Sequence, residues 1–165
     1  NKFEMEELII HPRVRADFYK NKPNMEVFGQ AVKESKNRLC YNGDLFIKSH
    51  FEAFEKEYPQ VERVMLGRGV MVNPGLLNLI CEGKSLDKEV LRAFQDEFYR
   101  KNQEVLSGDR AVLFKMKELW FFMIHLFEGA EKAAKKIKKA EKRHVYEECI
   151  ERLFSDYPLN QKLVK

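Results

Sequence analysis

The chain reads LCYNGDLF at residues 39–46 and VMLGRG at residues 64–69, and these two stretches decide its expected fold. In each stretch three consecutive apolar residues end in a turn, NGD at residues 42–44 and GRG at residues 67–69. Short apolar runs bounded by polar residues are typical of strands buried in a parallel sheet. Each turn is followed by residues that favour a helix, so both stretches are predicted to be strand–turn–helix units.

A third unit of the same kind precedes these two. The apolar run LII at residues 8–10 ends in HPR at residues 11–13, and residues 25–36 then show helical spacing. The carboxyl ends of parallel strands meet at one edge of a sheet, so the three turns are expected to form one pocket. In a (β/α)8 barrel that edge carries the active site, and the loops after the last two strands commonly bind a phosphate. A complete barrel needs about 250 residues, so these 165 residues are expected to supply only the C-terminal part of one.

Strand signals end near residue 83, and the rest of the chain has the spacing of helices. Helices are expected at about residues 85–106, 110–127, 130–142 and 144–154. We therefore predict an α/β part, residues 1–83, that forms three βα units of a TIM barrel. An all-α helical bundle domain, residues 84–165, is predicted to follow it.

Composition narrows the class of protein. The net charge is +4 and the sequence pI is about 8.9, which suits an anionic partner. Cys40, Cys81 and Cys149 are far apart and lack metal-ligand spacing, so neither a metal site nor a disulfide scaffold is expected. No apolar run approaches the ~18 residues of a membrane span, and the first residues do not resemble a signal peptide. The expectation is a cytoplasmic protein without membrane contact.

The two glycine-containing turns are candidates for a phosphate site. NGD is also typical of an ordinary turn or hairpin, and the glycines of GRG can serve packing alone. Their position between strand and helix on adjacent strands favours phosphate, because glycine lets backbone amides approach a ligand closely. Arg68 adds a fork of donors that suits phosphate oxygens. His11 ends the first strand, and its side chain either has a structural role or faces the same pocket. Arg13 and Arg15 follow on a loop that is either a solvated surface or a contact for an anion.

Residues 130–143 combine small apolar residues on one helix face with seven basic and two acidic residues on the rest. Charge runs are usually solvated faces, but this density of lysine favours a polyanion such as a nucleic acid. A membrane surface is the competing polyanion, although the alanine face lacks the bulky anchors of interfacial helices. Contacts to the polyanion are expected from four of these lysines and from two on the preceding helix, namely Lys135, Lys136, Lys138, Lys139, Lys115 and Lys117.

The aromatic cluster WFF at residues 120–122 has the helical spacing of a core, so we interpret it as core in preference to a base-stacking platform. No nucleophile stands beside a base and no pair of carboxylates stands out, so no catalytic residue is expected in this chain. Cys40 lies within a predicted strand and is expected to be buried and inert.

Several segments in their order resemble the tRNA-dihydrouridine synthases. LIIHPRVRADFYKNKPN at residues 8–24, LCYNGDLF, and VMLGRGVMVNPGLL at residues 64–77 resemble the last three barrel strands of that family. KMKELWFFM at residues 115–123 and the lysine-rich helix look like its C-terminal helical domain. The resemblance covers nearly the whole chain. It implies a flavoenzyme that uses FMN, usually with NADPH as reductant, to reduce particular uridines of tRNA to dihydrouridine.

The resemblance also implies roles for individual residues. The histidine of the family's HxR motif corresponds to His11 and would contact the flavin, while the helical domain would bind tRNA. The family's Asn-Gly-Asp and Gly-Arg segments would hold the FMN phosphate, and they correspond to Asn42, Gly43, Asp44, Gly67 and Arg68. The HxR segment departs from the family pattern, because Val14, Asp17 and Asn21 stand where many members have Thr, Gln and Gly.

The family's catalytic cysteine, in an asparagine-rich Cys-Pro motif, and its flavin-contacting lysine belong to earlier barrel strands, and neither motif occurs in these residues. We therefore expect the chain to be inactive by itself and to need the missing N-terminal barrel half as its partner. Self-association through the open sheet edge is a further expectation. Two alternatives remain: a non-catalytic RNA-binding module without flavin, and another phosphate-binding TIM-barrel enzyme.

Overall fold

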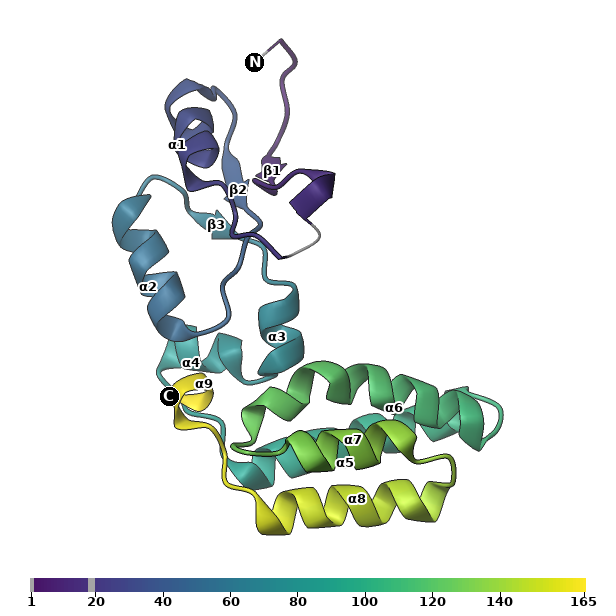
Figure 1. Cartoon of the computed structure of the whole chain (residues 1–165). Coiled ribbons are helices and arrows are strands. Elements are labelled where there is room, and N and C mark those ends of the chain that lie inside the picture. The colour runs from purple at the N-terminus through teal and green to yellow at the C-terminus, as the bar shows by residue number, and fades with distance from the viewer. Residues whose placement is uncertain (1, 18–19) are drawn as a thin grey trace. The chain divides into compact units, whose positions relative to one another are not determined.

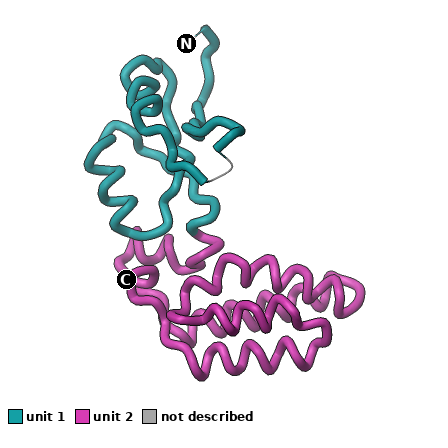
Figure 2. The backbone as a smooth tube through the Cα atoms, viewed as in Figure 1, with its two compact units in different colours: residues 1–69 teal, residues 70–165 magenta. Residues whose placement is uncertain are grey.

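The computed structural model describes residues 2–17 and 20–165. Residue 1 and residues 18 and 19, which form the aromatic pair of the predicted first loop, lie outside the described residues. The chain divides into two compact units, residues 1–69 and residues 70–165 (Figure 2). Each unit has an apolar core of its own. The boundary predicted near residue 83 concerns functional domains and stays a prediction.

Unit 1 is built on a three-stranded parallel sheet (Figure 1). β1 (Leu8–Ile10), β2 (Leu39–Tyr41) and β3 (Arg63–Val64) lie in the order β1-β2-β3. The first two strands have the bounds that the sequence predicts, whereas the third begins one residue earlier and ends two residues earlier than predicted. The parallel sheet confirms the α/β class of this part of the chain.

Two helices connect the strands. α1 (Met25–Glu34) joins β1 to β2, and α2 (Lys48–Glu57) joins β2 to β3. The Asn24 side chain caps α1, because its oxygen accepts a hydrogen bond from the Val27 amide at 3.0 Å. A short 3-10 helix, η1 (Arg15–Asp17), lies in the loop before α1.

An aromatic cluster forms the centre of the unit 1 core. Phe28 is fully buried, and its ring centroid lies 4.8 Å from that of Tyr41 and 5.2 Å from that of Tyr58. Phe54 stacks on Tyr41 at 4.4 Å. These side chains come from α1, β2 and the end of α2, so the cluster joins both connecting helices to one face of the sheet. Aromatic pairs at such distances stabilise a core beyond the area that they bury.

The other face of the sheet carries Ile9, Cys40 and Arg63, which the strand register places side by side. Cys40 is buried as expected, and burial raises the pKa of its thiol. Ile9 is 45% exposed, and Met65, just beyond β3, is 40% exposed. Parallel sheets are normally covered on both faces, so the described residues cover this face only in part.

Unit 2 is built from helices, as the sequence predicts for the C-terminal part. These are α4 (Leu76–Glu82), α5 (Lys88–Val105), α6 (Asp109–Met123), η2 (Ile124–Leu126), α7 (Glu131–Lys139), α8 (Arg143–Asp156) and α9 (Gln161–Val164). The short helix α3 (Arg68–Val72) precedes them where the sequence predicts only a turn.

Some helix ends differ from the prediction. α5 begins after Asp87, whose carboxylate accepts a hydrogen bond from the Val90 amide at 2.7 Å, and not after Ser85. The helix predicted at residues 130–142 is shorter, because α7 ends at Lys139. Lys142 is instead the N-cap residue of α8, and Arg143 is the first residue of that helix.

The core of unit 2 contains a hydrogen-bonded pair of aromatic residues. Trp120 is 2% exposed, and its Nε1–H donates to the Tyr146 hydroxyl oxygen at 2.9 Å. Gln95 Nε2 donates to the same oxygen at 3.4 Å, and burial raises the pKa of Tyr146. Trp120 therefore confirms the core interpretation of WFF, but Phe121 is 71% exposed and contradicts it. Adjacent helix residues point about 100° apart, so Trp120 and Phe121 cannot share the same side of α6.

No helix in the described part of the chain is both long and apolar enough to cross a bilayer. Among residues 2–17 and 20–165, no three His, Cys, Asp or Glu side chains lie close enough to hold a metal ion. The three cysteines are free thiols.

Candidate functional site

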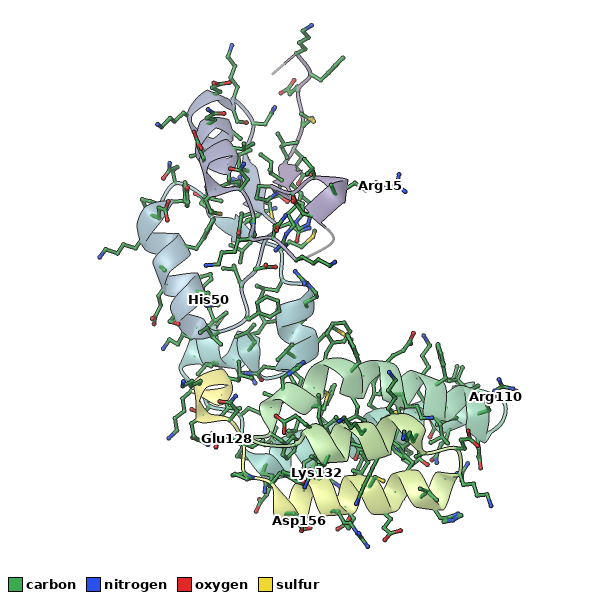
Figure 3. The ribbon with its side chains drawn as sticks, in the orientation of Figure 1. Arg15, His50, Arg110, Glu128, Lys132 and Asp156 are labelled. Atoms are coloured by element: carbon green, nitrogen blue, oxygen red, sulfur yellow. The ribbon has the colours of Figure 1, made fainter. Side chains whose placement is uncertain are left out.

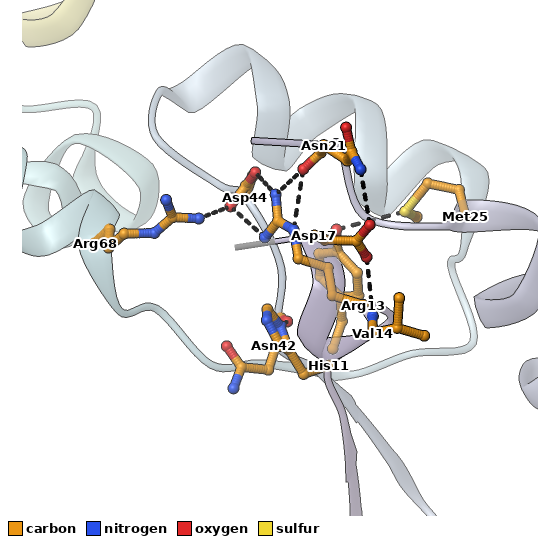
Figure 4. Close-up of polar contacts among 10 residues, drawn as sticks. His11, Arg13, Val14, Asp17, Asn21, Met25, Asn42, Asp44 and Arg68 are labelled. Carbon is orange, nitrogen blue, oxygen red and sulfur yellow. Dashed lines mark hydrogen bonds and ion pairs between the residues drawn. The ribbon is translucent and has the colours of Figure 1, made fainter. Parts of the chain in front are cut away.

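The loops that follow the three strands are joined through Asp44 (Figure 4). Arg13, from the loop after β1, donates from Nη1 to Asp44 Oδ1 at 3.1 Å and from Nη2 to Oδ2. Arg68, after β3, donates from Nη2 to Asp44 Oδ1 at 2.5 Å. The structure therefore brings together at one carboxylate three loops that are separate in the sequence.

Two arginines of different exposure share one carboxylate in this cluster. The Arg13 side chain is 4% exposed and the Arg68 side chain is 31% exposed. The hydrogen bond with Asp44 raises the pKa of Arg13. Burial opposes the ionisation of Asp44, but the bond from Arg13 and the charge of Arg68 outweigh it and lower the pKa of that carboxyl. Asp17 adds a second negative charge near Arg13, so the basic group of the cluster that can meet an anionic ligand is Arg68, whose side chain is partly exposed.

The Arg13 side chain is oriented by three residues at which the sequence departs from the pattern of the family that it resembles. Asp17 accepts hydrogen bonds from the Val14 amide at 2.9 Å and from Asn21 Nδ2 at 2.8 Å. These bonds lower the pKa of Asp17. The Asn21 carbonyl in turn accepts from Arg13 Nε at 3.1 Å and from Nη2 at 2.7 Å. Val14, Asp17 and Asn21 thus form a local network that orients Arg13.

His11 and Asn42 join the loops after β1 and β2. The Asn42 carbonyl lies 2.5 Å from His11 Nδ1, and because a carbonyl can only accept, Nδ1 carries the proton. The Asn42 amide donates to the Ile10 carbonyl at 2.9 Å, which continues the strand pairing into the loop. The imidazole is therefore held in one orientation beside the Asp44 cluster (Figure 4).

The two turn glycines have different surroundings. A Cβ on Gly43 would lie 1.9 Å from the Tyr41 hydroxyl oxygen, so glycine is needed there to admit the Tyr41 ring. That ring belongs to the core, and its hydroxyl lies 3.4 Å from Met25 Sδ. A Cβ on Gly67 would meet no atom within 4 Å. Packing alone therefore explains Gly43, whereas the space at Gly67 is open to a ligand.

The lysines of α7 form a second candidate surface, for a polyanion. The side of α7 that faces the core carries Ala133 and Ile137, both buried. The exposed side carries five lysines, and none of them has an ion-pair partner within 4.0 Å among the described residues; these are Lys132, Lys135, Lys136, Lys138 and Lys139 (Figure 3 labels the first). Basic residues elsewhere in unit 2 often have acidic partners, as Arg143 has in Asp109 at 2.6 Å. The charge of α7 is thus left for an external partner.

The other residues predicted to contact RNA differ in their settings. Arg15 is exposed on η1, where Figure 3 shows it directed outward. Lys117 is half-buried on α6, and Lys115 pairs with Glu118 at 2.8 Å on the same helix. Arg13 is directed to Asp44 and Asn21, and this position favours a role in organising the loop.

Sequence reasoning missed two features of these surfaces. It assigned Asp44 to phosphate contact, but a carboxylate repels phosphate, and the structure shows it as the shared acceptor for two arginines. It also missed the exposure of Phe121. The pairing of Asp44 with two arginines could have been found by asking which acidic residue of the three loops neutralises the charge of their arginines.

The comparison with protein families identifies the class of protein. The model of the family described as dihydrouridine synthase (Dus) matches residues 5–157. This match covers most of the chain, so the chain belongs to the dihydrouridine synthase family and the resemblance seen in the sequence is confirmed. Members of this family reduce uridine in tRNA to dihydrouridine and are in general flavin-dependent. A search of curated proteins returned no match.

Asp44→Asn is expected to destabilise unit 1 by about 2–3 kcal/mol at neutral pH, because two arginines, one almost buried, would lose their counter-charge. Folding lowers the pKa of the Asp44 carboxyl. The stability that this carboxylate contributes is therefore fully present above its unfolded pKa of about 3.9, and it is lost as pH falls through the folded pKa. Wild type and variant should therefore converge in acid. Amide hydrogen exchange of β2 measures this difference.

Glu62→Gln is the matched control for Asp44→Asn, since Glu62 forms a surface pair with Arg38 at 3.9 Å and is 71% exposed. Exposed ion pairs of this kind contribute little to folding stability. Amide hydrogen exchange in β2 of this variant should therefore stay near the wild-type rate. Equal effects of the two substitutions would show that the Asp44 cluster does not hold the loops together.

Proposed function

We propose that this chain is the C-terminal part of a flavin-dependent tRNA-dihydrouridine synthase that reduces uridine to dihydrouridine in tRNA. In this proposal residues 1–83 contribute the flavin-phosphate end of a TIM barrel and residues 84–165 form a tRNA-binding helical domain. The single observation that supports it most is the convergence of three strand-end loops on the Arg13–Asp44–Arg68 cluster, in a member of this family. NADPH is the proposed reductant, and the cytoplasm is the proposed location.

The chemistry of the site fits the phosphate end of FMN. The Arg68 side chain is 31% exposed, and a Cβ on the neighbouring Gly67 would meet no atom within 4 Å. Arg68 would donate to the phosphate, while Asp44 orients Arg68 and Arg13 without touching the anion. The guanidinium of Arg68 lies over the Phe46 ring at 5.4 Å, which further restricts its position. The residues proposed to contact the cofactor are His11, Asn42, Gly43, Gly67 and Arg68, and Asp44 is proposed to support cofactor binding by orienting Arg13 and Arg68.

When bound, FMN would supply the hydride for the reduction of uridine. The residues of this chain would bind and orient the cofactor, and His11 would contact it from the end of β1. No residue of this chain is assigned a catalytic role, so we propose that these residues by themselves are inactive. The family's cysteine acid and flavin-contacting lysine would come from the other half of the barrel.

The sheet supports the proposal that further strands complete a barrel. Its second face carries Ile9 and Met65 with 45% and 40% exposure. An apolar parallel sheet of this kind would be buried by the remaining strands of a barrel. Where those strands are absent, the same face and the open edges would favour self-association.

Arg68→Ala, tested in the native protein from its source cells, is expected to weaken FMN binding at least about tenfold, because it removes a charge-assisted hydrogen bond to phosphate. Riboflavin lacks the phosphate, so its affinity should not change. The affinities of both flavins can be measured by fluorescence titration.

Arg38→Ala is the control for Arg68→Ala, because Arg38 directly precedes β2 and so lies at the opposite end of the strands from the loops. It should leave both flavin affinities unchanged. An equal loss of riboflavin and FMN binding in Arg68→Ala would contradict the phosphate role. A native protein that binds neither flavin but binds tRNA would favour the non-catalytic RNA-binding module.

A further inference from the structure

A wide groove runs between α6 and α7 in unit 2, with a volume of about 920 Å³. α6 lines it with Phe114, Lys117 and Phe121, and α7 lines it with Ala134, Lys135 and Lys138. The core of unit 2 borders the groove through Trp120 and Ile137, whereas no residue of the Arg13–Asp44–Arg68 cluster lines it. Its combination of aromatic rings and lysines limits the ligands that it can accept.

Two phenylalanines of the groove are unusually exposed. Phe114 is 61% exposed and Phe121 is 71% exposed, and they lie seven residues apart, hence on the same side of α6. The buried residue Met116 lies on the other side of the helix. Neighbouring exposed apolar side chains of this size mark an interaction site in preference to a core.

The ring of Phe121 is available for stacking. Its centroid lies 5.0 Å from that of Phe122, and the two planes are at 89°. In such an edge-to-face contact Phe122 covers at most one face of the Phe121 ring, so at least one face is not covered by it. Ala134 across the groove is small and leaves space for a planar group.

The charges around the groove favour an anion. Lys117, Lys135 and Lys138 line it, and none of them has an ion-pair partner among the residues that the structure describes. The acidic residue of the groove, Glu118, is paired with Lys115 at 2.8 Å. Lys135 and Lys138 also belong to the exposed face of α7, so the groove and the basic face are continuous.

We propose that this groove binds an unpaired nucleotide of RNA, with the base stacked on Phe121 and the adjoining phosphates bound by Lys117, Lys135 and Lys138. Single-stranded RNA is recognised by this combination of aromatic stacking and basic side chains. An amphipathic peptide or a membrane surface would also contact exposed phenylalanine. Neither of them requires an uncovered face of the aromatic ring, as a stacked base does. The inference rests on the proposed tRNA-binding function and adds to it the kind of nucleotide that is bound.

The test uses the whole chain and compares single-stranded oligouridylate of about ten nucleotides with duplex RNA of the same length. The wild-type chain should prefer the single strand. Phe121→Ala should weaken binding of the single strand about tenfold, the scale of one lost base stack. Its salt dependence should be unchanged, because no charge is removed.

Two further variants separate stacking from apolar contact. Phe121→Trp keeps an aromatic face and should bind as tightly as wild type, whereas Phe121→Leu should be as weak as Phe121→Ala. Phe94→Ala is the matched control, since Phe94 is an exposed phenylalanine of α5 that does not line the groove. It should leave binding unchanged.

Single-strand affinity that is equal in wild type and Phe121→Ala would overturn the inference, and so would full binding by Phe121→Leu. Binding to anionic lipid vesicles that depends on Phe121, with RNA binding unaffected, would overturn it in favour of a membrane. In each of these cases tRNA binding that still depends on the α7 lysines would leave the proposed function intact. A wild-type chain that binds neither tRNA nor oligouridylate would contradict the proposed function itself.

Discussion

Affinity for tRNA is expected to fall by two to three orders of magnitude when four lysines of α7 are replaced by alanine, namely Lys135, Lys136, Lys138 and Lys139. A basic side chain near a polyanionic surface contributes about 1 kcal/mol, and each tenfold change in affinity is about 1.4 kcal/mol. These lysines are exposed and have no ion-pair partner among the described residues, so they keep their charge for an external partner. The core side of α7 is untouched, so the fold should survive.

The salt dependence of tRNA affinity provides a second measurement on the same variant. Each phosphate contact contributes about 0.7–0.9 to the slope of log affinity against log salt concentration, so the slope should flatten by about 3. Filter binding at several salt concentrations gives both quantities. The control replaces three basic residues that have acidic partners on their own helices, namely Arg100, Lys101 and Arg152. If that control loses as much affinity as the α7 variant, total charge decides binding and α7 has no special role.

Phe28→Ala is expected to destabilise unit 1 by about 3–5 kcal/mol, the usual range for removing a buried phenylalanine. The Phe28 ring is fully buried and contacts the rings of Tyr41 and Tyr58. A cavity at this point would loosen the packing of α1 on β2. The loops after β1 and β2, which carry His11 and Asp44, would become less ordered as a result. Amide hydrogen exchange across β2 should accelerate by more than a hundredfold, since 1.4 kcal/mol is a factor of ten.

Val27→Ala on the same helix is the control. Val27 is 50% exposed, so this substitution should lower the stability of unit 1 only slightly. Trp120 is the sole tryptophan of the chain and lies in the core of unit 2, so its fluorescence reports that unit separately. It should keep its native signal in Phe28→Ala. Similar exchange rates in the two variants would mean that the aromatic cluster does not hold unit 1 together.

Much of the fold could be predicted because its signals are local. The bounds of β1 and β2 follow from three-residue apolar runs between polar residues, and these runs are the strands. The end of β3 was misplaced because Met65 and Leu66 are as apolar as a strand, while the pairing that ends the strand depends on β2. α3 was missed because it is only five residues long and contains Gly69, a poor helix former.

The site could be predicted in position but not in detail. Parallel strands bring their carboxyl ends together, which places the three loops near one another without further information. The pairing of Asp44 with Arg13 and Arg68 joins residues 31 and 24 positions apart, and no local pattern specifies it. The reason for Gly43 was equally hidden, because the ring that requires glycine there comes from the core.

The dihydrouridine content of tRNA, measured position by position in source cells with the gene intact and disrupted, tests the central claim most directly. Dihydrouridine is expected to disappear from at least one position when the gene is disrupted. Wild-type protein should restore it, whereas the Arg68→Ala variant should restore it poorly at limiting FMN. Unchanged dihydrouridine at every position of every tRNA would contradict the assignment of this chain to tRNA uridine reduction.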